Sequence, residues 1–316
     1  MVKEIKKIAV IGAGPVGLYL AWKLSKRDCK VTVFEKEKEA GHKPCTGLIS
    51  ERIRNFIPLK DSLIENRIDF CFIHFPKKII KLRLKPSHLL INRIKFDKHL
   101  LKFAQESGVE IVFNQEIKEM PCSFDKIIGC DGALSETRDL LGLPKPHFLL
   151  GLQLFREGGG NVNEVDVWPL KRGFCWKIRR FSSIEYGALG ELNSVKKDFQ
   201  EFCRKQKIEF LPKELKASLV PQGLILSSSR NIALCGDAAG LTKPWSGGGI
   251  IWGLTAADIL LKNFPNFKKY NREAKRFFKL KIVKGKAMSA LVYFLGTNFP
   301  WVLPSKNSRD NDFPFL

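Results

Sequence analysis

Short apolar runs recur near the start, the middle and the end of the chain, and helical patterns lie between them. The runs cover Ile8–Ile11, Val31–Phe34, Asp125–Cys130 and Asn231–Cys235. Continuous apolar runs of this length, each ending in a turn signal, are typical of strands buried on both faces of a parallel sheet. The intervening helical patterns would cover that sheet, so these segments predict an α/β domain.

Between these segments, hydrophobic and polar residues alternate with a period of two. Ile80, Leu82 and Leu84, for example, alternate with Lys81 and Arg83. This period predicts half-buried antiparallel strands inserted into the α/β domain. We expect such strands over 67–75, 79–84, 148–156, 163–168, 174–179, 184–190 and 215–220, and helices over 50–56, 92–108 and 194–206.

The order of the two patterns predicts a discontinuous domain organisation. A nucleotide-binding domain would comprise 1–62, 92–146 and 223–265, and the inserted antiparallel β-sheet domain 63–91 and 147–222. A basic, amphipathic and helical C-terminal segment would cover 266–316. Its last dozen residues, 305–316, are polar and are expected to be loose.

The first run leads into a glycine-rich turn that indicates a dinucleotide. Gly12 would let the chain turn off the strand, Gly14 would let backbone amides approach a pyrophosphate, and Gly17 would let the next helix pack closely. Pro15 and Val16 complete this turn, whose helix N-terminus faces the phosphates. Glu35, at the end of the second strand with Lys36 after it, can accept hydrogen bonds from ribose hydroxyls.

Charge and cysteine content restrict the binding partners and the cellular location that we expect for the protein. The formal net charge is +22, and basic residues are densest over Lys268–Lys286, where apolar residues interleave them. That segment suits a helix on an anionic bilayer or a nucleic-acid face, although lysine is abundant along the whole chain. The eight cysteines form no CxxC pair, and no run reaches the length of a membrane span. We therefore expect a cytoplasmic protein, with peripheral membrane contact as an option.

Three separated motifs together resemble the FAD-binding pattern of a flavoprotein class that includes aromatic hydroxylases, flavin halogenases and geranylgeranyl reductases. They are the Gly12–Gly17 turn with Glu35, the Asp131-Gly132 pair, and Gly236-Asp237-Ala238. The resemblance implies a Rossmann-like three-layer fold and bound FAD, with Asp237 on the ribityl chain. A capping or turn role is the simpler alternative for Asp237. Glycines 247, 248 and 249, followed by Ile250, would bring a helix N-terminus close to the flavin.

Finer features resemble the geranylgeranyl reductases, which saturate isoprenoid double bonds with reduced FAD. The loop Lys43–Ser50, containing Cys45, Thr46 and Gly47, looks like a family loop beside the flavin. The segment Asn92–Gly108 looks like the family's RxxFDxxL helix, which implies that Arg93 pairs with FAD phosphate. Phe174-Cys175-Trp176 occupies the place of an aromatic YxWxFP segment, although the proline of that segment is absent here.

Several of these residues have a simpler reading that the sequence leaves open. Cys45 is either a turn residue or a contact to substrate or flavin, and Trp176 is either a core residue or a cavity wall. Arg93 could merely cap its helix. Asp131 suits the organisation of a turn near FAD better than a role as an acid. The five histidines show no ligand spacing, so we expect no metal.

The resemblance implies hydride transfer from reduced FAD to an isoprenoid alkene, with Cys45 or water giving the proton and Trp176 lining the site. The electron donor would be NAD(P)H or a ferredoxin. An anionic membrane surface is a further expected partner, and nucleic acid is not. Two alternatives stay open: a class A flavin monooxygenase acting on an aromatic substrate, and a non-catalytic flavin-binding protein whose basic tail binds membrane or nucleic acid.

Overall fold

The computed structural model describes residues 6–41 and 43–313, which divide into two compact units. The first unit comprises 1–42, 94–147 and 221–282, and the second comprises 43–93, 148–220 and 283–316. The segment 43–62, which the sequence analysis grouped with the nucleotide domain, clusters with the second unit because β3 (Leu48–Ser50) pairs with β5 (Lys78–Ile91).

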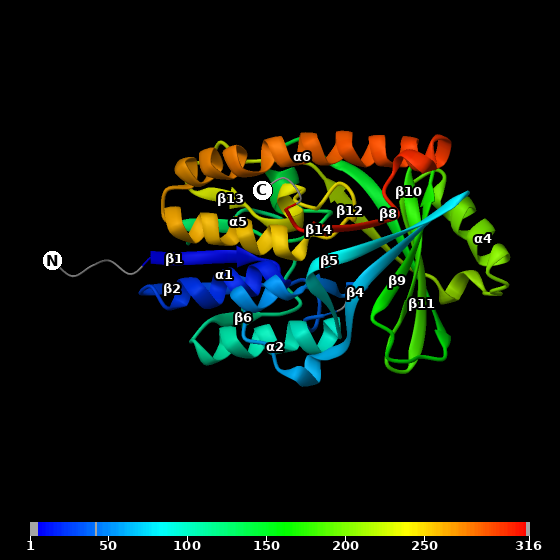
Figure 1. Ribbon diagram of the computed structural model, residues 1–316. Helices are drawn as coiled ribbons and strands as arrows, with labels where there is room; N and C mark the ends of the chain where they lie inside the picture. Colours follow the sequence, from blue (N-terminus) through cyan, green and yellow to red (C-terminus); the bar gives the residue numbers. More distant parts are fainter. Residues whose placement is uncertain (1–5, 42, 314–316) are drawn as a thin grey trace. The chain divides into compact units, whose positions relative to one another are not determined.

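The first unit is built on a five-stranded sheet in which every pairing is parallel (Figure 1). Its order is β13-β7-β1-β2-β6, where β13 is Ile232–Leu234, β7 is Lys126–Gly129, β1 is Lys6–Ile11, β2 is Cys29–Phe34 and β6 is Glu110–Val112. Four of the five strands, β1, β2, β7 and β13, overlap the apolar runs of the sequence. The parallel α/β prediction is therefore confirmed.

Five helices accompany this sheet. They are α1 (Pro15–Ser25), α2 (Arg93–Glu106), α3 (Glu136–Leu140), α5 (Ile250–Asn263) and α6 (Phe267–Asn298), which continues into the second unit. α1 and α5 pack so closely that a Cβ on Gly253 would lie 2.6 Å from Cγ2 of Val16. The Tyr19 hydroxyl of α1 donates a 2.6 Å hydrogen bond to Asp258 of α5, which fixes the same contact.

The second unit contains a nine-stranded sheet in the order β12-β8-β11-β10-β9-β4-β5-β14, with β3 beside β5. Besides β3 and β5, its strands are β4 Ile64–Phe75, β8 His147–Glu157, β9 Glu164–Leu170, β10 Gly173–Arg179, β11 Ser183–Glu191, β12 Lys216–Gln222 and β14 Lys306–Asp310. Most strand pairings printed for this sheet are antiparallel, as expected, but β4 pairs with β9 and β14 with β5 in parallel.

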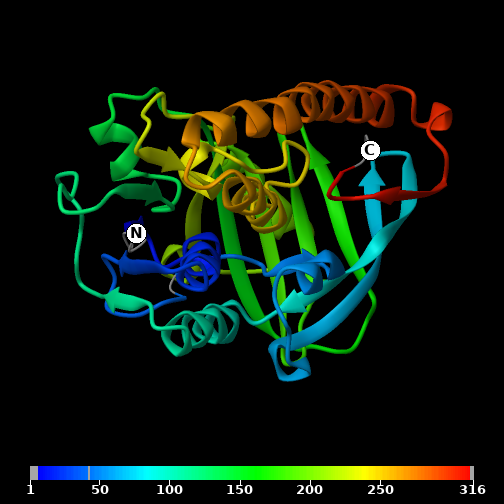
Figure 2. The same ribbon diagram turned by 90° about the vertical axis from the view of Figure 1, so that its left-hand side faces the viewer.

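The C-terminal residues also differ from the prediction. The segment 305–316 was expected to be loose, but Lys306–Asp310 forms β14 beside β5 (Figure 2). Arg52 holds the end of this strand through two hydrogen bonds to the Asp310 carboxylate, of 2.7 and 2.5 Å. The buried Asp312 accepts a hydrogen bond from Ser50. Residues 314–316 lie outside the described part of the chain.

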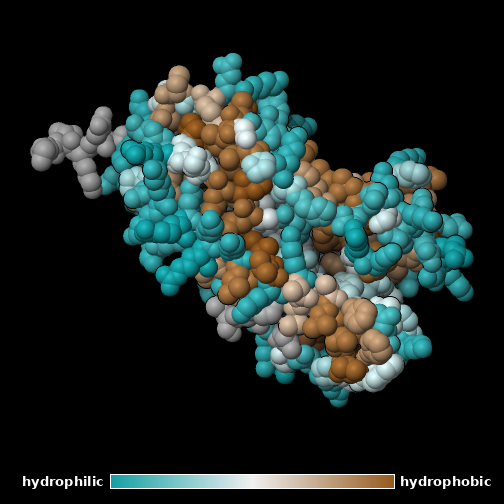
Figure 3. Space-filling view, turned by 90° about the horizontal axis from the view of Figure 1, so that it is seen from above, coloured by the Kyte–Doolittle hydropathy of each residue, from teal (hydrophilic) through white to brown (hydrophobic). Residues whose placement is uncertain are grey.

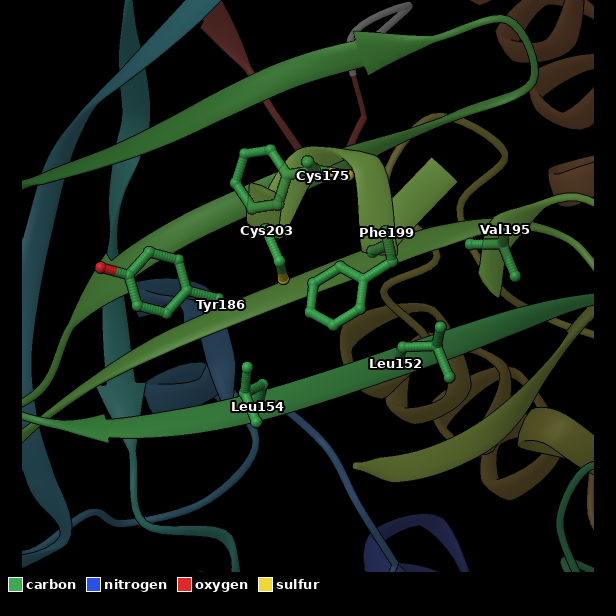
Figure 4. Close-up of a cluster of buried hydrophobic side chains, with 9 residues drawn as sticks. Leu152, Leu154, Cys175, Tyr186, Val195, Phe199 and Cys203 are labelled. Atoms are coloured by element: carbon green, nitrogen blue, oxygen red, sulfur yellow. The ribbon is translucent and has the colours of Figure 1, made fainter. Parts of the chain in front are cut away.

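The helix α4 (Val195–Lys205) covers one face of the second sheet. Leu152, Leu154 and Cys175 point from the strands toward Phe199 and Cys203 of this helix and form a buried apolar cluster (Figure 4). Because side chains alternate along a strand, the neighbours of these residues point to the opposite face. The polar network described below lies on that opposite face.

Short 3₁₀ turns connect the remaining elements. They are η1 Glu51–Asn55, η2 Asp61–Leu63, η3 Pro212–Glu214, η4 Gly236–Ala239 and η5 Pro300–Val302. The first of these lies where the sequence suggested a helix over 50–56. No helix of the described residues is long and apolar enough to cross a membrane.

Candidate functional site

Two glycines of the turn after β1 lie where a side chain would collide with the backbone. Gly12 has φ of +102°, and a Cβ there would lie 2.5 Å from the carbonyl oxygen of Cys130. A Cβ on Gly17 would lie 2.0 Å from the carbonyl oxygen of Gly12. Gly14 differs, because nothing lies within 4 Å of the position of its missing Cβ. Gly14 is also the N-cap of α1 and supplies no side-chain cap, so the start of this helix is open to a ligand.

The carboxylate at the end of β2 is held against this turn. One oxygen of Glu35 accepts a 2.6 Å hydrogen bond from the Ala13 amide, and the other accepts one of 3.0 Å from the Glu37 amide. A carboxylate offers about four lone-pair sites, so acceptor capacity remains for ribose hydroxyls. Lys36 follows as an exposed residue.

The Asp131-Gly132 pair organises the turn into α3. The Asp131 carboxylate accepts hydrogen bonds from the Ser135 hydroxyl at 2.5 Å and from the amide and hydroxyl of Thr137 at 2.8 and 2.9 Å. Gly132 has φ of +85°. The structure thus supports a turn-forming role for Asp131, as the sequence favoured.

Arg138 connects this turn to the Gly236-Asp237-Ala238 motif, a role the sequence analysis did not assign. Its side chain is fully buried and donates hydrogen bonds to the carbonyl oxygens of Ala238 at 3.3 Å and Ala133 at 3.0 Å. The sequence signal was a basic residue seven positions after Asp131, but only the fold shows that it reaches the later motif.

The last glycine-rich turn leads into α5 without a side-chain cap. Its N-cap is Gly249, and a Cβ there would lie 2.6 Å from Oδ1 of Asp237. Asp237 therefore sits at the start of the helix that Ile250 begins. Gly247 has φ of +67°, and Gly248 packs against the Lys243 side chain. The hydroxyl of Ser246 is buried and has no hydrogen-bond partner in the described structure.

These features of the first unit fit a bound dinucleotide. Two helix N-termini lack side-chain caps, the space in front of Gly14 is open, and the Ser246 hydroxyl needs a polar partner. A carboxylate lies beside each of the two turns. Phosphates and sugar hydroxyls supply the complementary acceptors and donors.

The second unit holds the other predicted residues, beginning with the loop before β3. Cys45 is exposed, and its sulfur accepts a hydrogen bond of 3.4 Å from the Gly47 amide. Gly47 has φ of +72°, and a Cβ there would lie 2.2 Å from the Ile91 carbonyl oxygen. The side chain of Arg93 lies beside the same glycine, 3.2 Å from that Cβ position.

Trp176 lies half-buried on β10, at the edge of an apolar cluster. The cluster contains Ile68, Leu84, Leu90, Val165 and Ile178. The indole nitrogen of Trp176 donates a 3.1 Å hydrogen bond to the buried Glu185. The residue therefore combines an apolar ring surface with one fixed polar contact.

The predicted site residues thus form two groups. The first unit brings together Gly12, Gly14, Pro15, Val16, Gly17, Glu35, Lys36, Asp131, Gly132, Gly236, Asp237, Ala238, Gly247, Gly248, Gly249 and Ile250. The second unit contains Cys45, Thr46, Gly47, Arg93 and Trp176. Among the described residues, no group of three or more His, Cys, Asp or Glu side chains is arranged to hold a metal ion.

Comparisons with known proteins agree with this organisation. The model of an NAD(P)-binding Rossmann-like domain matches residues 10–43, which contain the glycine turn and Glu35. Among curated relatives, a digeranylgeranylglycerophospholipid reductase from Methanococcus vannielii is 23% identical over 86% of this chain and 80% of its own length. A geranylgeranyl diphosphate reductase from Rhodobacter capsulatus is 24% identical over 77% of this chain and 71% of its own.

Solved structures show the same fold. A geranylgeranyl bacteriochlorophyll reductase-like protein from Thermoplasma acidophilum superposes with a TM-score of 0.78 at 20% identity, over 92% of this chain and 88% of that one. CtdE in complex with FAD gives 0.69 at 16% identity, over 92% and 93%. The tetrameric form of 2-methyl-3-hydroxypyridine-5-carboxylic acid oxygenase also gives 0.69 at 16% identity, over 96% and 95%.

The expected resemblance is therefore confirmed. The curated relatives and the solved structures both support the expectation of an FAD-dependent oxidoreductase. The chain has the fold of these flavoproteins and is similar, over most of its length, to geranylgeranyl reductases.

Proposed function

We propose that this protein is an FAD-dependent reductase that saturates isoprenoid double bonds of a geranylgeranyl lipid or related prenyl substrate. The observation that carries the proposal is the presence, in one unit, of an exposed thiol and an apolar aromatic surface. Cys45 supplies the thiol, and Trp176 on its apolar cluster supplies the surface. The similarity to reductases named for geranylgeranyl substrates supports the substrate class.

FAD would be held by the first unit. The open N-terminus of α1 would bind the pyrophosphate, Glu35 the adenosine ribose, and Asp237 the ribityl hydroxyls. The uncapped N-terminus of α5 would favour negative charge on the flavin ring. When bound and reduced, FAD supplies the hydride for alkene reduction.

The residues of the second unit would bind and orient the substrate. An isoprenoid chain has no hydrogen-bonding groups, so it requires an apolar surface that excludes water. Trp176 and the partly buried Cys71, Leu82 and Val167 offer such side chains on one face of the sheet. The Sγ–H group of Cys45, or a water molecule beside it, would give the proton to the second alkene carbon.

Anionic lipid is the proposed docking partner, and the protein would act from the cytoplasmic side as a peripheral protein. One side of α6 is buried through Phe267, Tyr270, Ala274 and Phe278. Lys275, Arg276 and Lys279 are exposed, as are the apolar Leu280 and Val283. Hydrophobic side chains also gather between hydrophilic ones on the face seen in Figure 3. A basic helix with exposed apolar residues suits a bilayer surface. Electrons would come from NAD(P)H or a ferredoxin.

An anaerobic assay tests the proposed reaction. The purified protein is loaded with FAD, reduced with dithionite and mixed with a geranylgeranyl lipid. We expect reoxidation of the flavin absorbance and a product heavier by two hydrogens per reduced double bond. Absence of both with a loaded, folded protein would refute the reductase proposal.

A flavin monooxygenase is the second candidate, because the fold is shared with an oxygenase. The same FAD-binding turns would serve that reaction. Oxygen-dependent turnover with an aromatic compound, together with NAD(P)H consumption and no reduction of the alkene, would favour it.

A further inference from the structure

A buried carboxylate in the second unit connects the Cys45 loop to the Trp176 indole. Glu185 is fully buried and lies on β11. Its Oε1 accepts hydrogen bonds from the Thr46 hydroxyl at 2.6 Å, the Gln153 amide at 2.8 Å and the Trp176 indole nitrogen at 3.1 Å. One oxygen atom therefore contacts both predicted catalytic regions.

Arg180 balances the charge of this carboxylate. Its Nε and Nη2 donate to Oε2 of Glu185 at 3.0 and 2.5 Å, and its Nη1 donates to Glu65 at 2.6 Å. Burial opposes the charged form of Arg180, but the two carboxylates raise its pKa overall. Arg180 also donates to the Thr46 carbonyl oxygen, so hydrogen bonds hold both the side chain and the backbone of Thr46.

The sheet geometry brings these groups to one face. Trp176 is paired with Gly187 across β10 and β11, and Gly187 is paired with Gln153 across β11 and β8. Glu185 lies two residues from Gly187, so it points to the same face as Trp176 and Gln153. A buried charge in this position is costly unless its hydrogen bonds are all made.

We propose that Glu185 is a positioning residue that fixes the Cys45 thiol and the Trp176 ring in one arrangement. The catalytic consequence of this arrangement rests on the proposed function, but the arrangement of the thiol and the ring can be tested independently. The cluster uses its donors and acceptors internally, which suits positioning better than ligand binding. Thr46, predicted as a cofactor contact, would act here by anchoring the loop between Cys45 and Gly47.

The test compares Glu185→Gln with the matched control Glu65→Gln. Both changes remove one carboxylate from Arg180, but Glu65 contacts neither Thr46 nor Trp176 through any hydrogen bond described here. The measurement is the rate of iodoacetamide labelling of Cys45, read by peptide mass spectrometry on the FAD-loaded protein. The background carries Cys122→Ser, because Cys122 is the other exposed cysteine of the described chain.

We expect Glu185→Gln to change the Cys45 labelling rate at least about fivefold, because the Thr46 anchor and its Arg180 partner are both disturbed. Glu65→Gln should stay close to the parent rate. Indole emission, measured as the difference between each protein and its Trp176→Phe version, should shift only in Glu185→Gln. Equal labelling rates in the parent and in both variants would overturn the proposal.

A second pair of variants covers the case in which Glu185→Gln does not fold. Thr46→Val removes only the two hydrogen bonds of the hydroxyl, to Glu185 and from Gln153, and should change the labelling rate in the same direction, while Thr46→Ser should restore it. If Thr46→Val labels like the parent, the proposed positioning is wrong.

Kinetics separates this inference from the proposed function. If the parent reduces the alkene, Glu185→Gln should lower kcat by about tenfold to a hundredfold with a smaller change in KM, because misplaced groups slow the chemical step. An unchanged kcat would overturn the positioning role. If the parent does not reduce the alkene, the proposed function fails, while the labelling and emission results still decide the role of Glu185.

Discussion

The indole of Trp176 lies directly over Gly187 on the neighbouring strand. A Cβ on Gly187 would lie 2.1 Å from Cζ2 and 2.4 Å from Cε2 of the ring. Glycine at this position therefore makes room for the ring, and Glu185 two residues earlier holds the ring nitrogen at 3.1 Å. The orientation of Trp176 depends on both residues.

Gly187→Ala should displace the Trp176 ring and destabilise the protein by about 1–3 kcal/mol, as overpacking does in other buried sites. The measurement is the free energy of unfolding in urea. In a Trp176→Leu background the same change should cost less, because the clashing ring atoms are gone. Equal costs in the two backgrounds would assign the penalty to the Leu152 carbonyl oxygen, which lies 2.6 Å from the same Cβ position, and not to the ring.

Local sequence patterns predict some parts of this fold and not others. The strand-turn-helix segments around Gly12, Asp131 and Asp237 were predictable, because each motif carries its own glycine and apolar signals. β14 was not predictable, since Lys306–Asp310 is polar and becomes a strand only by pairing with β5. The role of Glu185 was also missed. A lone carboxylate in an apolar strand was the available signal, but its partners come from three separate segments of the chain.

Glu35→Gln should weaken FAD binding by about tenfold or more, because it removes a charged acceptor from the glycine turn and the ribose. The dissociation constant can be measured by quenching of flavin fluorescence on binding to the apoprotein. Glu37→Gln is the matched control, since Glu37 is exposed and contributes its backbone amide to Glu35. A dissociation constant for Glu35→Gln equal to that of the control would exclude the ribose contact.

Asp310 should make stability depend on acid pH. Burial alone would raise its pKa, but hydrogen bonds from Arg52 and from the amides of Phe313 and Asp312 lower it overall. A carboxyl group whose folded pKa lies below its unfolded value of about 3.9 stabilises the fold above that pH. This stabilisation is lost as the pH falls through the folded pKa. We therefore expect the free energy of unfolding to decrease below about pH 4.

Asp310→Asn should remove this part of the pH dependence and cost roughly 1 kcal/mol at neutral pH. Urea unfolding at a series of pH values measures both effects. Asp61→Asn serves as control, because the Asp61 side chain is 96% exposed and lies 3.6 Å from Arg54. If Asp310→Asn keeps the acid dependence of the parent, the Arg52 pair does not anchor β14 in the way inferred here.

Charge reversal on α6 should release the protein from anionic vesicles. Each Lys or Arg near such a surface contributes about 1 kcal/mol, so Lys275→Glu, Arg276→Glu and Lys279→Glu together should weaken binding at least about a hundredfold. Co-sedimentation with phosphatidylglycerol–phosphatidylcholine vesicles measures this, and binding by the parent should fall as salt is added. The control reverses Lys196, Lys197 and Lys213, three exposed lysines elsewhere, and so changes the net charge equally. A specific α6 surface requires the first triple variant to lose binding while the second retains it. Equal losses would instead mean that net charge alone attracts the protein to lipid.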